Sequence, residues 1–497
     1  MDSLTFKISI GKDKQNLVSI DRFKLEKQKI NFLLGESGIG KTLLSKTMYG
    51  LLDPAKLKIN INDIGYKEYL LSKQAQEIKK DGFFVFQEPS THINPLLKIG
   101  TQLKEGNLST GLNESELLQQ LWPDAEDNHF LRLLKIYPKP YRPSGGEKQR
   151  FLLIMAFKKI HRFLNNKNLT DAIFIFDEPS GSLDDHLRNV FIQMLIEKYS
   201  EKAFTILFIT HDYSIISEVV NHYPNIKNEI IFKELQKHGT SVKLQPFEPK
   251  AYISWLQASN RPTKGFANKT NKVLLSLNPE IIVFNRRIKI YKNSNVQQLS
   301  SLQIHEGEIV YLKAPSGAGK TTIAKIIMGL IKADKFELKI ADKMFTQNTA
   351  FDKWRKKLWG KQITMTFQHA DEALNLKSTV KQTLSNLPSV KRPDPAELLS
   401  TLHIIFDTEI DDSFLKKKIS QLSGGQKQRL NLLRAFLLET PLLILDEPLN
   451  GLDFASIQKV INLLLNRKDN GAGILIISHN EEIIDTIVDQ GNIYYLQ

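Results

Sequence analysis

The chain has 497 residues, more than one hydrophobic core usually serves, so two or more domains are expected; 41% hydrophobic and 25% charged residues exclude a disordered or fibrous protein. No apolar run approaches the roughly 18 to 20 residues that cross a bilayer, the N-terminus lacks a secretory-signal pattern, and the absence of cysteine excludes disulfide chemistry, which favours a cytoplasmic address. The net charge of +14 would fit nucleic acid, an anionic lipid surface or lysine-rich solvated faces, and we favour the last because no compact block of Lys and Arg stands out.

A glycine-rich turn is the first motif that carries chemistry. Residues 29–42, KINFLLGESGIGKT, run from an apolar strand through the turn into a helix. Backbone N–H groups at the positive end of such a helix cradle phosphates, Lys41 would reach the β and γ phosphates, and Thr42 would ligate Mg²⁺. The expected cofactor-binding residues are Gly35, Glu36, Ser37, Gly38, Ile39, Gly40, Lys41 and Thr42. For a lone motif the alternative is an ordinary turn with a surface lysine.

Two polar motifs come next. Gln87 follows an apolar strand, where its amide could touch both Mg²⁺ and the attacking water, although a glutamine at a strand end is by itself unremarkable. Further on, Ser144, Gly145 and Gly146 precede EKQRFLLIMAF, an apolar-spaced run. This phrase predicts a helix start whose backbone N–H groups and serine hydroxyl bind an anion.

Two apolar runs then end in ionisable residues. The run AIFIFDE, 172–178, is typical of a strand buried in a parallel sheet, so Asp177 would hold the Mg²⁺ shell and Glu178 would polarise the attacking water. The run TILFITH ends at His211, whose imidazole could bond the γ phosphate and orient the glutamate. The alternatives are acids that cap the next helix and a histidine satisfied at a strand end.

A less periodic segment follows at about 238–272, rich in Pro, Lys, Ser and Asn. It predicts a linker, packed in part through Trp255. The expected organisation is therefore a first nucleotide-binding domain over 1–237, a linker over 238–272 and a second such domain over 273–497.

The second half repeats all of these motifs in the same order. In both halves 103 residues separate the loop lysine from the repeated serine. The polar stretch HRFLNNKNLT accounts for the extra length of the first half, and we interpret it as a surface insertion. The second set of candidates comprises the loop residues Ala314, Pro315, Ser316, Gly317, Ala318, Gly319, Lys320 and Thr321, then Gln368, then Ser423, Gly424, Gly425 and Gln426, then Asp446, Glu447 and His479.

Together these motifs resemble the ATP-binding cassette (ABC) family, whose signature LSGGQ appears at 422–426 and as PSGGE at 143–147. The resemblance implies an α/β fold of two tandem P-loop NTPase cassettes, each a RecA-like α/β core with an antiparallel β subdomain and a helical subdomain. It also implies ATP hydrolysis with ATP and Mg²⁺ as cofactors. In that family two cassettes meet head to tail, and each ATP lies between the phosphate loop of one and the signature of the other, so the repeat resembles a pre-joined dimer.

The segment after each glutamine points to a group within the family. Residues 86–103, FQEPSTHINPLLKIGTQL, are similar to peptide and nickel importer ATPases, and residues 367–384 keep the pattern in part, with Asn375 retained. This resemblance implies an importer subunit for peptides, nickel or a metal chelate on the cytoplasmic face of the membrane. Its partners would be integral membrane permease subunits, docked on the helical subdomains, and an extracytoplasmic solute-binding protein, with no direct nucleic acid.

Two other members of the family stay open as alternatives. Ribosome-associated translation factors of the F subfamily also have two cassettes, but they usually read DEPTNHLD where this chain reads DEPSGSLD and DEPLNGLD, and their linker is long and helical. Sugar-importer ATPases of similar length usually depart from SGGQ in the first signature.

The two implied ATP sites differ in sequence. An aromatic residue that stacks on adenine is expected ahead of each phosphate loop; Tyr291 fits in the second half, whereas only Phe6 and Phe23 are near in the first. Pro143 and Ala314 depart from the family pattern and both fall in the site that uses the second phosphate loop. We expect that site to be the weaker one in hydrolysis, with Ala314 reducing backbone freedom relative to glycine.

Overall fold

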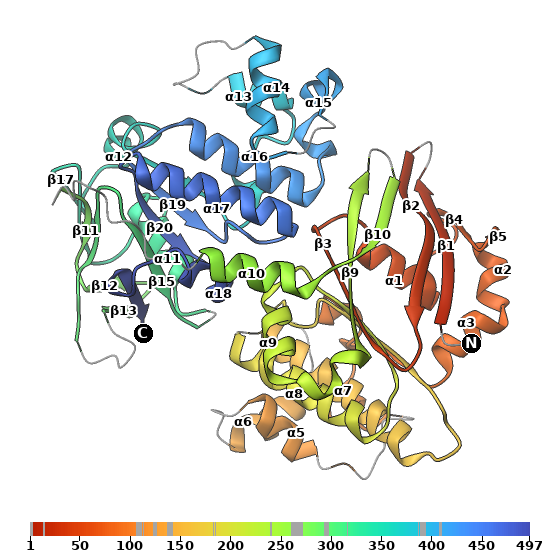
Figure 1. The fold of residues 1–497 in the computed structure, drawn as a ribbon. Helices are drawn as coiled ribbons and strands as arrows, with labels where there is room; N and C mark the ends of the chain where they lie inside the picture. The colour runs from red at the N-terminus through yellow and green to blue at the C-terminus, as the bar shows by residue number, and fades with distance from the viewer. Residues whose placement is uncertain are drawn as a thin grey trace. The chain divides into compact units, whose positions relative to one another are not determined.

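The computed structural model describes residues 3–12, 15–105, 112, 114–122, 127–136, 143–181, 183, 185–238, 241–259, 272–292, 298–315, 317–385, 387, 394–406 and 410–497 (Figure 1). Ser316 of the second predicted phosphate loop lies outside these residues. The chain divides into two compact units, Met1–Pro249 and Lys250–Gln497. The predicted domain boundaries at 237 and 273 stay predictions.

The first unit contains two sheets. The four-stranded antiparallel sheet has the order β2 (Gln15–Glu26), β1 (Ser3–Lys12), β4 (Lys58–Ile61) and β5 (Ile64–Gly65). The six-stranded sheet has the order β10 (Ser241–Pro246), β9 (Ile230–His238), β3 (Ile30–Gly35), β8 (Thr205–Ile209), β7 (Ile173–Asp177) and β6 (Phe83–Val85). Its ladders are parallel apart from the β9–β10 hairpin. Every residue of β3, β7 and β8 is buried, which explains why these strands are apolar throughout.

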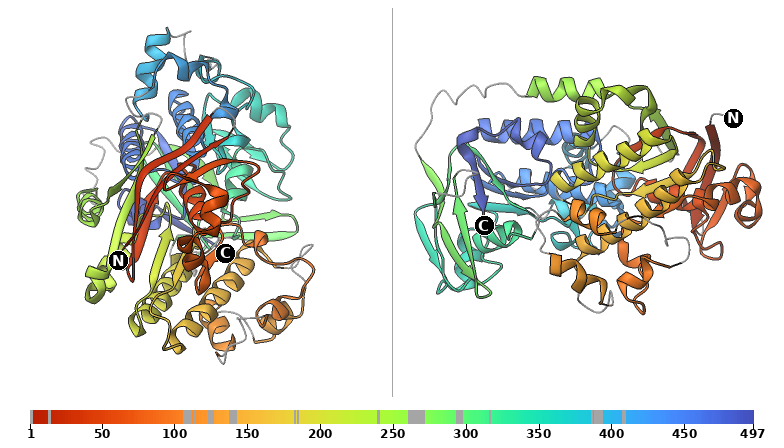
Figure 2. Two further views of the ribbon diagram at one scale, coloured as in Figure 1. Left: turned by 90° about the vertical axis from the view of Figure 1, so that its right-hand side faces the viewer. Right: turned by 90° about the horizontal axis from the view of Figure 1, so that it is seen from below.

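The helices of the first unit fall into two groups. The first group covers the sheets: α1 (Lys41–Tyr49), α7 (Gly145–Asn165), α8 (Asp185–Glu201) and α9 (Ser214–His222) lie beside the six-stranded sheet, and α2 (Tyr66–Leu71) and α3 (Lys73–Lys80) lie beside the antiparallel sheet, where α2 contacts β4 and β5 (Figure 1). The helical region comprises α4 (Ile99–Gln102), α5 (Glu114–Leu121) and α6 (Asp127–Leu134). Helices α5 and α6 lie together, at the other end of the unit from β1 and β2 (Figures 1 and 2).

The second unit repeats this plan. Its antiparallel sheet has the order β14 (Leu302–His305), β11 (Val273–Leu277), β16 (Glu337–Ile340) and β17 (Lys343–Thr346). The main sheet has the order β12 (Glu280–Val283), β13 (Arg286–Tyr291), β21 (Ile493–Leu496), β15 (Ile309–Lys313), β20 (Gly473–Ile477), β19 (Leu442–Asp446) and β18 (Ile363–Thr366). The helices are α10 (Pro249–Ser259), α11 (Lys320–Ile327), α12 (Phe351–Lys357), α13 (Val380–Ser385), α14 (Pro395–His403), α15 (Asp412–Lys416), α16 (Gly424–Leu437), α17 (Phe454–Asp469) and α18 (Glu481–Asp485).

The predicted architecture is confirmed in both units. The central strands follow one order, β3-β8-β7-β6 in the first unit and β15-β20-β19-β18 in the second, so the catalytic motifs emerge from equivalent strand ends. Each unit buries its own core, which includes Leu33, Leu44 and Ile175 in the first and Leu312, Ile323 and Ile444 in the second.

Two irregular segments contain more helix and strand than predicted, while the predicted packing of the linker through Trp255 is found in its ring contact with Phe454. The stretch 161–170 is not only a surface insertion, because its first five residues extend α7, which has 21 residues where α16 has 14. Phe163 is buried there, so the added turns have an apolar face. The predicted linker contains the strand β10 and the helix α10, and both were missed because the segment shows little hydrophobic periodicity. No helix in the described part of the chain is long and apolar enough to span a membrane.

Candidate active sites

The two phosphate loops place glycines where the backbone turns into the left-handed region. Gly38 and Gly40 have φ of 81° and 111°, and Gly317 and Gly319 have φ of 82° and 100°. Only glycine adopts such angles without strain. Neither α1 nor α11 has a side-chain cap, so the first-turn N–H groups of both helices stay available to an anion.

The loop lysines fold back over their own loops. Lys41 Nζ donates to the carbonyl oxygens of Gly35 at 2.5 Å and Glu36 at 3.0 Å, and Lys320 Nζ donates to that of Ala314 at 2.5 Å. Burial lowers the pKa of Lys41, with Glu178 opposing. Each ammonium group therefore lies inside its own phosphate loop, next to the helix N-terminus that would bind phosphates.

The expected penalty for Ala314 is not found. The equivalent Gly35 has φ of 140°, and a Cβ there would lie 2.8 Å from the Leu235 carbonyl oxygen, so glycine is required in the first unit. Ala314 is not among the residues with positive φ. Because the backbone at position 314 does not have the positive φ of Gly35, alanine fits there without strain.

The first unit assembles a compact group around Glu178. Gln87 Nε2 donates to Glu178 Oε2 at 2.9 Å, His211 Nδ1 lies 3.1 Å from Glu178 Oε1, and Lys41 Nζ lies 3.8 Å from the same oxygen. Burial would raise the pKa of Glu178, but the attraction to His211 and Lys41 outweighs it and the pKa lies below its usual range. For His211, burial acts to lower the pKa, but the Glu178 carboxylate has the larger effect, and the pKa of His211 is raised overall. The carboxylate is therefore ionised and held from three sides.

Asp177 and Thr42 lie together beneath this group. Thr42 Oγ1 donates to Asp177 Oδ1 at 3.0 Å, while Asp177 Oδ2 is buried without a hydrogen-bond partner among the described residues. Burial raises the pKa of Asp177 to about 6, with the Thr42 hydroxyl opposing. A buried, partnerless carboxylate oxygen beside a hydroxyl is a donor set that suits Mg²⁺.

The second unit holds its glutamate differently. Glu447 Oε2 accepts hydrogen bonds from the backbone N–H of His479 at 3.1 Å and from Ser478 Oγ at 3.4 Å, and His479 Nε2 lies 3.4 Å from Glu447 Oε1. In the described part of the chain, no hydrogen bond joins Gln368 to Glu447. Burial raises the pKa of Glu447 to about 7, with the His479 N–H opposing.

Asp446 also fits a cation. Both of its carboxylate oxygens are buried without a hydrogen-bond partner among the described residues. Burial raises its pKa, with nearby Thr321 and Lys325 opposing. The strands that carry the two aspartates, β7 and β19, pair with β6 and β18, and Gln87 and Gln368 lie two residues after the ends of β6 and β18.

Both Ser-Gly-Gly phrases start helices, as expected. Ser144 and Glu147 bond reciprocally, from Ser144 N to Glu147 Oε2 at 2.6 Å and from Glu147 N to Ser144 Oγ at 3.2 Å. Ser423 and Gln426 form the same capping box at 3.1 and 3.2 Å. The serine hydroxyls thus accept from their own helices, and the first-turn N–H groups of the two glycines after each serine remain for an anion.

The aromatic candidates lie in different surroundings. Phe6 and Phe23 are 0% and 1% exposed and face one another in the β1–β2 ladder, so they belong to the core and cannot stack on a base. Tyr291 ends β13 and is 6% exposed, opposite Tyr495 in β21. Among the described residues of the first unit, no hairpin matches β12–β13, and β10 takes that edge of the sheet instead.

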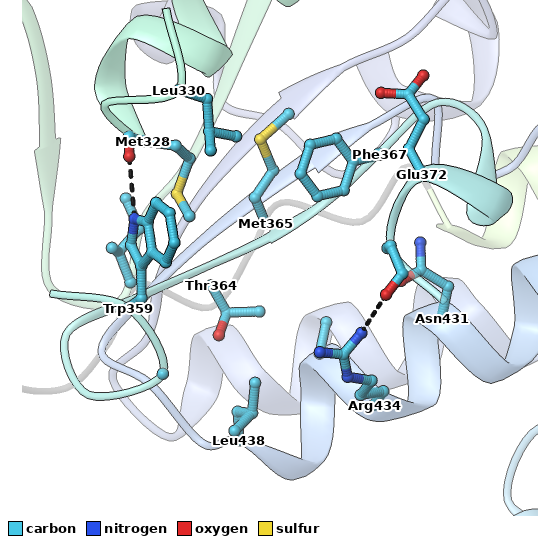
Figure 3. Close-up of a pocket in the computed structure, with 14 residues that line it drawn as sticks. Met328, Leu330, Trp359, Thr364, Met365, Phe367, Glu372, Asn431, Arg434 and Leu438 are labelled. Carbon is cyan, nitrogen blue, oxygen red and sulfur yellow. Dashed lines mark hydrogen bonds between the residues drawn. The ribbon is translucent and has the colours of Figure 1, made fainter. Parts of the chain in front are cut away.

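A groove in the second unit is lined by residues of β18 and α16 (Figure 3). Its volume is about 260 Å³, and Met328, Leu330, Trp359, Met365 and Phe367 form its apolar wall. Arg434 from α16 lies on the facing side, where its Nη1 donates to the Ala373 carbonyl at 2.8 Å.

In the first unit the matching place is filled by rings. His92 lies 5.2 Å from Phe83 and 5.4 Å from Phe86, and Phe84 lies 4.8 Å from Phe86. Counted from the glutamine, the second unit has Ala373 in place of His92 and Met365 in place of Phe84, which leaves the space open.

Comparison with known proteins decides the family. The family model described as "ABC transporter" matches residues 18–180 and 297–450. The chain belongs to this family. Its two units are therefore ABC cassettes that bind and hydrolyse ATP. The first match covers phosphate loop, glutamine, signature and carboxylate pair in one cassette, and the second match covers the same set in the other.

Several ABC proteins resemble the chain along nearly its whole length. The glutathione import ATP-binding protein GsiA of Escherichia coli (strain K12) is 22% identical over 98% of this chain and 84% of that protein. The uncharacterized ABC transporter ATP-binding protein YejF of the same strain is 26% identical over 92% of this chain and 86% of its own length. A putative ABC transporter ATP-binding protein of Treponema denticola is 26% identical, covering 96% and 91%.

Solved structures agree in fold. A structure titled RNase-L Inhibitor has a TM-score of 0.61 at 18% identity, covering 98% of this chain and 89% of that one. The archaeal ribosome recycling factor aABCE1, solved with the stalk protein aP1, has a TM-score of 0.62 at 18% identity with the same coverage. At this identity the likeness shows the fold of two ABC cassettes and nothing about partners.

Sequence reasoning missed the arginine cluster beside His211. Arg188 Nη1 donates to Asp185 Oδ1 at 3.0 Å and to Ser214 Oγ at 2.6 Å, and it pairs with Asp212. Arg188 is only 5% exposed. Two features of the sequence could have indicated it. Asp212 directly follows His211, and Arg188 falls in the helix that follows Asp177 and Glu178.

Proposed function

We propose that the chain is the ATP-hydrolysing subunit of an ABC importer for peptides, nickel or a metal chelate. The observation that carries this proposal is similarity over 98% of the chain to a glutathione import ATP-binding protein. The FQEP segment after Gln87 supports the same group of importers. The chain would act at the cytoplasmic face of the membrane with permease subunits and a solute-binding protein.

In this proposal the two cassettes close head to tail around two ATP molecules. Hydrolysis then reopens them, and the motion passes to the permease through the segments after Gln87 and Gln368. Site one would join Gly40, Lys41, Thr42, Gln87, Asp177, Glu178 and His211 to Ser423, Gly424 and Gly425. Site two would join Lys320, Thr321, Gln368, Asp446, Glu447 and His479 to Ser144, Gly145 and Gly146.

Within each site the chain's own groups divide the work. Thr42 with Asp177, and Thr321 with Asp446, would hold Mg²⁺, which when bound supplies positive charge next to the phosphates. Glu178, ionised and held by Gln87 and His211, accepts a hydrogen bond from the attacking water and orients it. Lys41 carries positive charge to the phosphate that leaves.

The groove of the second cassette is the proposed docking place for one permease subunit. Its occupant would be an apolar helical segment, because the wall is apolar and the lining carries one charge of each sign, Arg434 and Glu372. In the first cassette the matching place holds the packed rings of Phe83, Phe86 and His92, so it would take a different segment.

A ribosome-associated factor is the second candidate. The net charge of +14 is compatible with it, but the structural likeness to ribosome factors shows the fold alone. The relatives similar in sequence along the whole chain include an import protein, so the importer is favoured.

Docking can be tested by site-specific crosslinking, because the chain has no cysteine of its own. Leu330 at the groove is 39% exposed, and Leu51, the equivalent residue of the first cassette, is 41% exposed. Each is replaced in turn, as Leu330→Cys or Leu51→Cys, and labelled with a benzophenone maleimide before the full chain is added to native membranes and irradiated. The proposal predicts a polytopic membrane protein crosslinked at 330 and a different one at 51. Crosslinks to ribosomal proteins, or none to membrane proteins, would refute it.

A further inference from the structure

We call His211 and His479 the switch histidines. Near each catalytic glutamate, two short stretches of chain must keep a fixed position relative to each other if the switch histidine is to face the glutamate. One is the start of the helix after the carboxylate pair, at Asp185 in α8 and Phe454 in α17. The other is the switch segment, which we define as residues 212–214 after His211 and 480–482 after His479. The two cassettes connect these stretches by different means.

The first cassette uses one buried side chain. Arg188 reaches from α8 to Asp185 at 3.0 Å, to Ser214 at 2.6 Å and to Asp212. The Nη1 of one guanidinium therefore connects the helix start to the switch segment from inside the cassette through charge-assisted hydrogen bonds.

The second cassette cannot build this network. The position equivalent to Arg188, eleven residues after the aspartate of the carboxylate pair, is Ile457, and the position equivalent to Asp212 is Asn480. Helix α10, from the segment between the cassettes, makes the connection instead (Figure 1). The Tyr252 hydroxyl donates to Glu482 Oε2 at 2.9 Å, and the rings of Tyr252 and Trp255 lie 5.6 and 5.4 Å from that of Phe454.

These contacts are substantial. Tyr252 is 0% exposed and Leu256, one turn later, is 8% exposed, so one face of α10 is packed. Aromatic pairs at these separations stabilise beyond the area they bury. Phe454 and Glu482 belong to the two stretches that Arg188 connects in the first cassette.

The chain just before α10 touches the other switch segment. The Phe247 ring lies 5.6 Å from that of Tyr213, and the Phe247 N–H donates to the Phe232 carbonyl at 2.9 Å. Only Phe247 and Glu248 separate the end of β10 from the start of α10. A single run of nine residues, 247–255, therefore contacts the residues after both switch histidines, each within its own cassette.

We propose that the segment 247–255 is a positioning element for ATP hydrolysis: Tyr252 and Trp255 hold the switch segment of the second cassette, as Arg188 holds that of the first, and Phe247 joins the two. This inference rests on the ATPase activity alone, so it stands or falls separately from the importer proposal. It assigns positioning roles to Tyr252 and Trp255, which act through Phe454 and Glu482.

The direct test follows Trp255 in the full chain labelled with 5-fluorotryptophan. The sequence has four tryptophans, so its ¹⁹F signal is assigned with the Trp255→Phe variant. On addition of Mg-ATP the signal should shift in the wild type and in Lys41→Ala but not in Lys320→Ala. No shift in the wild type, or the same shift in Lys320→Ala, would overturn the proposal.

Turnover gives the second readout. Tyr252→Phe and Trp255→Ala should lower kcat roughly two- to thirtyfold with KM for ATP unchanged. Trp255→Phe keeps a ring and should restore most of the rate, and Gln257→Ala, on an exposed position of α10, is the matched control. Should Trp255→Ala unfold, Tyr252→Phe decides, since it removes one hydroxyl. A wild-type kcat in Tyr252→Phe and Trp255→Ala contradicts the positioning role.

Discussion

At the scale of single residues, the two catalytic glutamates do the same task in different surroundings. Glu178 is stabilised as an anion by His211 and Lys41, whereas burial outweighs the His479 N–H and Lys320 at Glu447 and raises its pKa to about 7. Both have positive φ, 47° and 50°, unusual for non-glycine residues and typical of functional sites. Backbone strain is thus shared, and the electrostatics differ.

The raised pKa of Glu447 predicts a pH-dependent stability. In the unfolded chain this acid ionises near its usual value, so the folded state binds the extra proton and loses stability as pH rises towards 7. Glu447→Gln should remove the loss, which amounts to at most about 3 kcal/mol. Differential scanning calorimetry without metal or nucleotide should show a higher Tm for the variant at pH 8 and little change at pH 5. An equal shift at both pH values would disprove this assignment.

The loop lysines carry a second prediction. Lys41→Ala combined with Lys320→Ala should abolish ATP turnover, because each ammonium lies in its phosphate loop and no other described lysine occupies that position. Measurement of phosphate release by the purified double variant checks it. Substantial residual turnover would show that phosphates bind elsewhere.

At the scale of elements, α7 differs from α16 in a buried charge. Lys158 is 1% exposed, donates to the Leu103 carbonyl and pairs with Glu114 of α5, whereas its equivalent in α16 is Leu437. The ion pair between Lys158 and Glu114 connects α7 to the helical region of the first cassette. Breaking a buried pair is costly because the remaining group keeps its desolvation penalty.

Lys158→Leu should therefore destabilise the first cassette by about 3 kcal/mol or more. Adding Glu114→Leu should recover most of that loss, since both charges are then removed. Urea unfolding of the single and the double variant measures the two free energies of unfolding, and the double variant should be the more stable of the two. A double variant as unstable as the single one would mean that the effect comes from packing of the leucine.

Elements also show what the sequence could predict. The sheet was predicted from the apolar runs at β3, β7 and β8, because strands buried on both faces consist of apolar residues. The phosphate sites were predicted from the glycine spacing of both loops, because positive φ favours glycine. Helix α10 could not be predicted in this way, because it is short and the exposed or half-buried residues between Tyr252, Trp255 and Leu256 include the apolar Ile253. The Arg188 cluster depends on tertiary contacts between residues far apart in sequence, which periodicity does not report.

At the scale of the whole molecule, two cassettes in one chain are free to diverge. The first keeps Glu178 in a network of three partners but has buried phenylalanines where the stacking aromatic is expected. The second has Tyr291, the open groove and a glutamate held by Ser478 and His479. Divergence of this kind fits one chain that serves two different partner surfaces.

Unequal hydrolysis follows from this divergence. We predict that Glu178→Gln lowers ATP turnover more than Glu447→Gln, because Pro143 alters the signature that would complete site two and Glu447 lacks the hydrogen bond from Gln368. Steady-state kcat of the two single variants measures the difference. Equal losses would show that the sites hydrolyse alike.

The most direct test of the importer account is affinity purification of the full chain carrying Glu178→Gln and Glu447→Gln, with ATP, from gently solubilised native cells. These substitutions should hold the closed, ATP-bound form with its partners attached. The account predicts that polytopic membrane subunits co-purify, along with a solute-binding protein that narrows the cargo. Recovery of ribosomal proteins without membrane subunits would contradict it and move the chain to translation.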